Sequence, residues 1–340
     1  MSNLSPGLPV GPDPAAPCES IAAEDPYRLV LPSAGGCGVL NLHKPADWTS
    51  RDVVNYVERR AKKLKVGHAG TLDPLATGVL VVAVGALTRL VPYLQQQSKT
   101  YRAEFLLGRE SNTDDVEGEV VELSNPPEPT REAIEELLPR FTGEIEQVPP
   151  LYSAVHINGQ RAYQLARRGE EFELPARKVV IHRLEVLEYA YPLLRLEMVC
   201  GSGTYVRSVG RDLAKLLGTA AVMQSLERSA IGGFRVEEAT PVQELTKENW
   251  SSFLRPAREA VSHLPALVLS AEPLWRLARG QLVSLASHPE IAGQMACCDA
   301  RAEFGLFDAE RNLYGIGRRS DSGEDLRGTL MLAKVPGVMG

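Results

Sequence analysis

The sequence predicts an α+β fold with a smaller β domain at the C-terminal end. The chain has 340 residues, which is enough for roughly two domains that each bury a core. Segments that alternate apolar and polar residues, as strands do, are interleaved with segments that repeat apolar residues at helical spacing. From about Leu267 onward, short strand-like runs alternate with glycine turns, which is typical of a small β domain.

The first 37 residues predict no regular structure. Residues 1–37 are rich in Pro, Gly, Ala and Ser and have little periodicity, so we expect a disordered extension. They lack the basic and apolar regions of a signal peptide and the Arg-rich character of a transit peptide. No apolar run in the chain approaches the roughly 20 residues of a membrane span. We therefore expect a cytoplasmic protein without a membrane segment.

The cysteines are expected to be free thiols. None of them forms a CxxC pair. Cys297 and Cys298 are adjacent, but no second Cys or His pair stands at the spacing that metal ligands need. A reducing compartment and the absence of a metal site are the simpler interpretation. The five residues are Cys18, Cys37, Cys200, Cys297 and Cys298.

The expected domain begins with a strand and a helix. Residues 38–45 have the pattern of a strand that ends in a turn. Lys44 at its end is an ordinary surface lysine, holds a neighbouring loop or contacts RNA. Thr49 followed by Asp52 is a helix start. Although the net charge is −6, basic residues gather on this helix and just beyond it. They either bind a phosphate backbone or form a solvated face: Arg51, Arg59, Arg60, Lys62, Lys63 and Lys65.

A glycine-rich loop after this helix contains one prominent acid. Residues 67–80 read Gly-His-Ala-Gly-Thr-Leu-Asp-Pro-Leu-Ala-Thr-Gly-Val-Leu and lead into a buried strand at 79–84. The glycines permit unusual backbone conformations, and Pro74 fixes the chain directly after Asp73. Such support suits a catalytic carboxylate, but an Asp before Pro also caps ordinary turns. The residues alone leave both interpretations open.

The middle of the chain combines expected core elements with an exposed basic segment. Residues 99–105 alternate as a strand that places Tyr101 on its apolar face, while the acidic turn 112–118 and a helix at 130–141 are expected to be structural. The following segment mixes prolines with aromatic and basic residues, as nucleic-acid-binding segments do: Tyr152, Arg161, Tyr163, Arg167 and Arg168.

A tyrosine and an arginine stand where a strand is expected to meet a helix. Strands around 179–187 and 193–200 precede a Gly-rich turn, and a helix runs from Ser208 to a stop at Gly218. Tyr205 and Arg207 lie at this junction. From the residues alone, the tyrosine packs under the turn and the arginine pairs with Asp212. Beyond them, a helix at 270–279 and a hairpin of 304–307 with 313–318 form the predicted β domain.

These segments together resemble the bacterial TruB-type tRNA pseudouridine synthases. The 67–80 loop matches the family's signature string, and a Lys-Pro strand end, a Lys-Thr-Tyr-Arg strand and a Gly-Thr-Tyr-Val-Arg junction follow the family's order. The resemblance extends from about Gly38 to the C-terminus. His43 departs from the family's aspartate, and Arg89 replaces a family lysine. Arg89 remains a possible RNA contact.

The resemblance implies a fold and a set of site residues. The fold is a catalytic domain at 38–263, with a mixed, mainly antiparallel sheet flanked by helices and a thumb-like insertion at about 146–172. A PUA-like RNA-binding domain at 264–340 follows. Asp73 is implied as the catalytic residue, with four residues in substrate binding. His68 intrudes into the RNA loop, Tyr101 stacks on the uracil, Tyr205 lines the pocket, and Arg207 pairs with Asp73.

The implied activity is isomerisation of uridine 55 in the T loop of tRNA to pseudouridine. The reaction needs no redox step, so no cofactor is expected. The expected partner is the T-arm of tRNA, with no guide RNA or protein partner, and the protein is expected to be a monomer. Three alternatives are a non-catalytic RNA-binding protein, a guide-RNA-dependent synthase, and a hydrolase using Asp73 and His68. Whether Asp73 attacks the ribose, attacks the ring or removes a sugar proton stays open.

Overall fold

The computed structural model describes residues 27–31, 36–153, 155–157, 159–170 and 172–336. Most of the predicted extension, residues 1–26 and 32–35, lies outside the described residues, as does Cys18. Residues 27–31 correct the expectation of disorder, because Val30 forms an antiparallel bridge with Lys334 near the other end of the described chain. The four described cysteines are free thiols, as expected.

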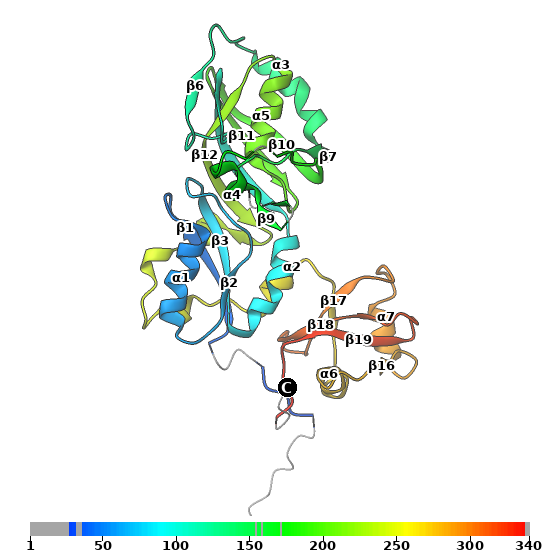
Figure 1. Cartoon of the computed structure of the whole chain (residues 1–340). Helices are drawn as coiled ribbons and strands as arrows, with labels where there is room; N and C mark the ends of the chain where they lie inside the picture. The colour runs from blue at the N-terminus through cyan, green and yellow to red at the C-terminus, as the bar shows by residue number, and fades with distance from the viewer. Residues whose placement is uncertain (1–26, 32–35, 154, 158, 171, 337–340) are drawn as a thin grey trace, which may run out of the picture.

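The main sheet is mixed and mainly antiparallel, which confirms the α+β prediction (Figure 1). Within the described ranges it has ten strands, in the order β14-β1-β3-β12-β4-β11-β10-β7, with β13 beside β12 and β2 beside β3. The pairs β1–β14 and β3–β12 are parallel. The strands are β1 (Gly38–Lys44), β2 (Val66–His68), β3 (Thr77–Val84), β4 (Lys99–Leu107), β7 (Gly143–Gln147), β10 (Arg177–Ala190), β11 (Leu193–Cys200), β12 (Ala221–Ile231), β13 (Phe234–Arg235) and β14 (Thr240–Pro241).

One half of the sheet is covered on both faces. Leu40 and Leu80 face helix α1 (Ser50–Ala61), which begins with the predicted Thr49–Asp52 capping box. Val39 and Val81 point the other way, toward the 3-10 helix η2 (Gly85–Leu90) and α2 (Val91–Gln96). Successive residues of a strand point to opposite faces of the sheet. Because both faces are buried here, neighbouring residues in these strands are apolar and form continuous apolar runs. Each fully buried Val or Leu stabilises the fold by roughly 1.5–3 kcal/mol.

The other half of the sheet is covered on one face only. Tyr101 and Phe105 of β4 point into a core beneath α3 (Arg131–Leu137), the 3-10 helix η3 (Leu138–Phe141) and α5 (Val206–Leu216). A Cβ on Gly210 would lie 2.0 Å from Cε1 of Phe105, so only glycine lets α5 approach β4 this closely. The opposite face carries ion pairs between neighbouring strands, such as Arg102 with Glu197 at 3.3 Å.

The C-terminal part forms a separate sheet beside α2 (Figure 1). Its five strands in the described chain run in the order β15-β17-β18-β19-β16, and the predicted hairpin is β17 with β18. Phe307 and Ile316 pack into the same core as η2 and α2. Arg89, whose contact with RNA stays a prediction, is exposed and donates to the Met331 carbonyl oxygen at 2.7 Å, which links η2 to β19. The elements are β15 (Ala266–Val268), α6 (Ala271–Ala278), β16 (Val283–Ser284), α7 (Pro289–Gln294), β17 (Glu303–Phe307), β18 (Leu313–Arg319) and β19 (Asp325–Met331).

Short elements connect these layers. In the described ranges, no helix is long and apolar enough to cross a membrane. The short strands and helices are β5 (Arg109–Ser111), β6 (Val120–Glu122), β8 (His156–Ile157), β9 (Gln160–Arg161), α4 (Ala162–Arg167), η4 (Val236–Glu238), η5 (Val242–Glu244), η6 (Trp250–Phe253) and η7 (Ala257–Val261).

Candidate active site

The loop that carries Asp73 runs from the end of β2 to the start of β3 and is anchored from several elements. The Ser50 hydroxyl, at the start of α1, accepts a hydrogen bond from the Leu72 backbone N–H at 2.8 Å. Nζ of Lys44 donates to the Pro74 carbonyl oxygen at 3.0 Å, so this lysine holds the loop, and its complete burial rules out an ordinary surface lysine. A catalytic side chain gains precision from such fixed surroundings.

Arg228 of β12 anchors the same loop from the opposite side. Its guanidinium donates to the carbonyl oxygens of Val79 at 2.8 Å and Gly70 at 3.2 Å. The two strands approach closely here, since a Cβ on Gly78 would lie 2.3 Å from the Arg228 carbonyl oxygen. The backbone of Gly78 also has φ +96, which disfavours other residues. The prediction that Asp73 is held in a fixed loop is therefore confirmed.

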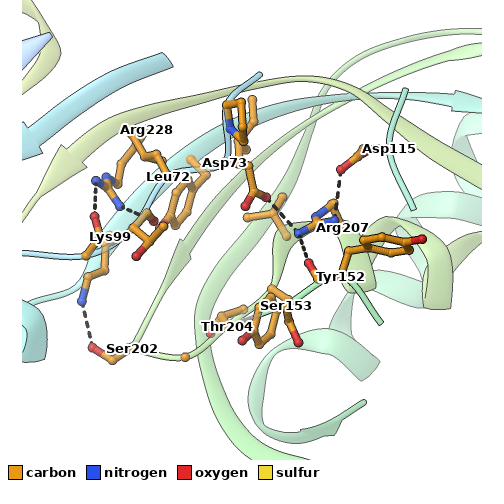
Figure 2. A pocket seen from close by; sticks show the side chains of 18 of the residues that line it. Leu72, Asp73, Lys99, Asp115, Tyr152, Ser153, Ser202, Thr204, Arg207 and Arg228 are labelled. Carbon is orange, nitrogen blue, oxygen red and sulfur yellow. Dashed lines mark hydrogen bonds and ion pairs between the residues drawn. The ribbon is translucent and has the colours of Figure 1, made fainter. Parts of the chain in front are cut away.

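Asp73 forms the ion pair with Arg207 that the resemblance implied. Nη2 of Arg207 lies 3.0 Å from Oδ2 of Asp73, and Nη1 lies 3.0 Å from Oδ2 of Asp115. The guanidinium also donates to the carbonyl oxygens of Thr113 at 2.8 Å and Tyr152 at 3.1 Å. Figure 2 shows Asp73 and Asp115 both directed at Arg207. The alternative pairing with Asp212 is wrong, because Asp212 pairs with Arg211 at 2.9 Å.

Asp115 was missed in the sequence, where its turn was interpreted as structural. The turn lies between β5 and β6, and it brings a buried carboxylate to the side of Arg207 away from Asp73. A run of acidic residues in a turn is usually a solvated surface, so the sequence offered no signal for burial.

The pKa of the Asp73 carboxyl is raised above its ordinary value. Burial is the largest cause, and the charge of Asp115 adds to it, while Arg207 and Lys44 oppose it. The Arg207 guanidinium favours the charged form of the carboxyl and so lowers its pKa. Burial nevertheless outweighs it. The Asp73 side chain is 36% exposed, so the surrounding pocket still opens to solvent.

A pocket of about 810 Å3 collects four of the five predicted site residues. Asp73, Tyr101, Tyr205 and Arg207 all line it. Tyr101 projects from β4 and burial raises the pKa of its hydroxyl, so it offers an uncharged aromatic ring. Tyr205 is the residue that precedes α5, and its backbone N–H donates to Oε1 of Gln147 at 2.8 Å.

His68 is the exception among the predicted residues. It ends β2 and does not line the pocket, although Ala69 and Gly70 directly after it do. The side chain is half-buried, and burial lowers the pKa of its imidazole. Its intrusion into an RNA loop stays a prediction.

Two pocket cations were missed in the sequence. Lys99 at the start of β4 is 6% exposed and Arg228 is 1% exposed. Nζ of Lys99 donates to the Ser202 hydroxyl at 2.8 Å and to the Gln95 carbonyl oxygen. The Arg228 guanidinium carbon lies 6.0 Å from the centre of the Tyr101 ring. Their burial left no signal in the sequence, because other charged residues, such as Arg102 and Glu227, stand in the same strands and are less buried.

The base of the predicted thumb is fastened to α5. The Val148 carbonyl oxygen accepts hydrogen bonds from the Ser208 hydroxyl and from Nη2 of Arg211, both at 2.9 Å. Tyr152 and Arg161 of the predicted thumb line the pocket. Arg168 is exposed and pairs with Glu170 at 2.6 Å. The side chains of Tyr163 and Arg167 lie outside the described residues.

The basic residues near α1 are mostly exposed, with one correction. Arg60 is half-buried: its Nε donates to the Leu245 carbonyl oxygen, and its guanidinium carbon lies 3.3 Å from the centre of the Tyr56 ring. Arg51 is exposed and pairs with Glu58 at 3.4 Å. The exposed cations without such a pair among the described residues, here called the basic strip, are Arg59, Lys62, Lys63 and Lys65.

Comparison with known families defines the class of protein. The family described as TruB family pseudouridylate synthase (N terminal domain) matches residues 58–206, which include the Asp73 loop, Tyr101 and Tyr205. The chain is also similar to a chain in the crystal structure of a Cbf5-Nop10-Gar1 complex, with a TM-score of 0.68 and 24% identity over 87% of this chain and 85% of that one. That likeness concerns the fold alone. The class is that of the pseudouridylate synthases.

Two curated relatives narrow the assignment. The tRNA pseudouridine synthase B of Rhodopirellula baltica is 40% identical over 304 residues, which cover 84% of this chain and 87% of that protein. The protein of the same name from Synechocystis sp. is 44% identical over 258 residues, 74% of this chain and 87% of that one. The chain belongs to the TruB family.

Proposed function

We propose that this protein isomerises uridine 55 in the T loop of tRNA to pseudouridine, with Asp73 as the catalytic residue. The relatives named tRNA pseudouridine synthase B support the tRNA substrate, since the chain spans most of their length. The observation that carries the proposal is the position of Asp73. It is an ionisable carboxylate on an anchored loop, paired with a buried arginine, in a pocket lined by Tyr101.

The chemistry requires few parts. The bond between N1 of uracil and C1′ of ribose breaks, the ring turns, and a bond forms between C5 and C1′. The proton lost from C5 is balanced by one gained at N1. Asp73 acts in its ionised form, by attack on the ribose, by attack on the ring, or by removing a sugar proton. Arg207 holds this carboxylate in place and opposes its protonation.

The pocket suits a base that has left its stack. Extrusion of a base costs a few kcal/mol, and stacking on an aromatic ring returns about 1–3 kcal/mol. Tyr101 offers that ring, and Tyr205 lines the same pocket. His68 enters the RNA loop as the base leaves.

The proposed partner is the T-arm of tRNA, bound by a monomer without a guide RNA or a protein partner. Residues 38–263 form the catalytic domain, whose thumb at about 146–172 closes on the RNA. Residues 264–340 form a PUA-like domain that adds RNA contacts. The separate C-terminal sheet supports this division.

The experiment is a pseudouridine map of unmodified tRNA transcripts after incubation with the protein and with Asp73→Asn. The wild type should modify position 55, and the variant should bind tRNA without forming product, because the amide keeps the shape and loses the charge. Asp321→Asn, in the exposed turn between β18 and β19, is the matched control and should be fully active. Turnover of Asp73→Asn within about tenfold of the parent, a difference of only about 1.4 kcal/mol in barrier, would contradict the role of Asp73.

A further inference from the structure

Three basic side chains are buried around the pocket without a carboxylate partner. Lys44, Lys99 and Arg228 are 0%, 6% and 1% exposed, and within the described ranges none of them has an ion pair. Buried charges are normally paired, because removing them from water is costly. Lys44 and Arg228 are explained by the loop, since their N–H groups go to its carbonyl oxygens. Lys99 has no such explanation.

One N–H donor of the Lys99 ammonium has no acceptor among the described residues. An ammonium group has three N–H donors. Two of them go to the Gln95 carbonyl oxygen and the Ser202 hydroxyl, and the described part of the chain supplies no acceptor for the third. Lys99 lines the pocket, so the third donor has access to a ligand there.

The surroundings of Lys99 make its charge unfavourable in the free protein. Burial lowers the pKa of Lys99 to about 8, and the neighbouring charge of Arg228 acts in the same direction. Neither Gln95 nor Ser202 carries a charge to offset this. A bound oxygen with negative charge would stabilise the ammonium, and RNA is rich in such oxygens.

We propose that the Lys99 ammonium binds an acceptor oxygen of the substrate RNA inside the pocket, either a phosphate next to the extruded nucleotide or a carbonyl of its uracil. This inference rests on the proposed function and adds a binding residue to the same site. In Figure 2, Lys99 and Ser202 lie at the end of the pocket away from Arg207 and Asp115. Lys99 therefore holds the nucleotide at the end of the pocket away from Arg207.

The competing interpretation is a structural brace. Lys99 connects the end of α2 to the turn at 201–204, which leads to Tyr205 and Arg207. A brace would place the same turn without touching RNA. The two roles differ in one respect: only a direct contact makes the effect of changing Lys99 depend on a particular oxygen of the RNA.

The test is a double-mutant cycle between protein and RNA. Hairpins of the T-arm carry a neutral methylphosphonate at one phosphate near the target, or 2-thiouridine or 4-thiouridine at the target itself. Single-turnover rates and binding constants are measured for wild type and for Lys99→Met, which keeps an apolar side chain of similar length. Hydrogen bonds to charged groups predict a loss of about tenfold or more for Lys99→Met on unmodified RNA.

The expected result is that one RNA change slows the wild type by about the same factor as the Lys99→Met substitution does on unmodified RNA. The same RNA change should not slow Lys99→Met any further. The change that shows this coupling identifies the oxygen as phosphate or uracil carbonyl. Additive losses for every RNA change would overturn the proposal in favour of the brace. A wild type that forms no pseudouridine would instead refute the proposed function, so the two failures are distinguishable.

Further variants keep the test decisive. Ser202→Ala breaks one bond of the brace and leaves the ammonium, so the coupling should persist; a loss equal to that of Lys99→Met with no coupling would support the brace. Lys178→Met, at an exposed lysine paired with Glu144, should behave as wild type. If Lys99→Met melts well below the parent, Lys99→Gln replaces it, because the amide can still bond Ser202 without carrying a charge.

Discussion

At the scale of single residues, the site depends on how one guanidinium is shared. Arg207 is 6% exposed and contacts Asp73 and Asp115 through different nitrogens, so its position is fixed independently of Asp73. The sequence could predict the Asp73 pair because both residues lie in recognisable motifs. It could not predict Asp115, Lys99 or Arg228, because their burial depends on packing between distant segments.

The first residue-scale prediction concerns the pH dependence of the reaction. Asp73 acts ionised, and its pKa is raised by burial, so the rate should fall with decreasing pH at a higher pH than for an ordinary aspartate. Arg207 opposes that rise in pKa. Asp115 raises the pKa of the same carboxyl, and Lys44 lowers it. Arg207→Gln should therefore move the acidic limb of the single-turnover rate profile to still higher pH.

The control for this prediction is Arg207→Lys, which keeps a positive charge and should shift the limb less. Thermal melts must show that both variants are folded at each pH. An acidic limb that stays in place in Arg207→Gln would mean that Arg207 does not act on the ionisation of Asp73 in the working enzyme.

At the scale of elements, the Asp73 loop is positioned by the start of a helix. The sequence correctly placed that start at Thr49 and Asp52, since a capping box is a local pattern. The sequence could not show the contact made by Ser50, the residue after Thr49. Its hydroxyl bonds both the N–H and the carbonyl oxygen of Leu72, which is 22 residues away in the chain. Helix α1 and the loop therefore form one unit.

The element-scale prediction is that Ser50→Ala weakens both stability and activity. The substitution leaves the buried Leu72 N–H without a partner, which costs roughly 1–3 kcal/mol in free energy of unfolding. Because Leu72 directly precedes Asp73, we also expect a lower single-turnover rate. Chemical denaturation and rate measurements check the two effects.

Thr130→Ala is the matched control for Ser50→Ala. Thr130 caps α3 by accepting from the Ala133 N–H at 3.2 Å, far from the loop in sequence. Removing this cap costs about 1 kcal/mol of stability. We expect it to leave the rate unchanged. If both variants lose activity equally, the effect follows from general instability and not from the loop.

At the scale of the whole molecule, the two sheets share a core that the sequence did not predict. The predicted C-terminal hairpin is present, because turn residues and alternation are local signals. Its packing against η2 and α2 through Phe307 and Ile316 is not encoded locally, and neither is the hydrogen bond of Arg89 to Met331. The exposed cations fall into two groups. Those on the open sheet face, such as Arg102 and Arg183, are paired with carboxylates. Those of the basic strip have no carboxylate within salt-bridge distance among the described residues.

The whole-molecule prediction is that the basic strip carries the salt-dependent part of tRNA binding. Replacing Arg59, Lys62, Lys63 and Lys65 by Ser should weaken binding of all RNA sequences alike, because cations that bind phosphates carry no sequence information. The slope of log affinity against log salt should fall by about one for each phosphate that the strip no longer neutralises. Arg60 is left in place, since it packs on Tyr56. The control removes four paired cations, Arg109, Arg131, Lys178 and Arg183, with the same change in net charge. An equal fall in slope for both sets would show that net charge, and not the strip, attracts the RNA.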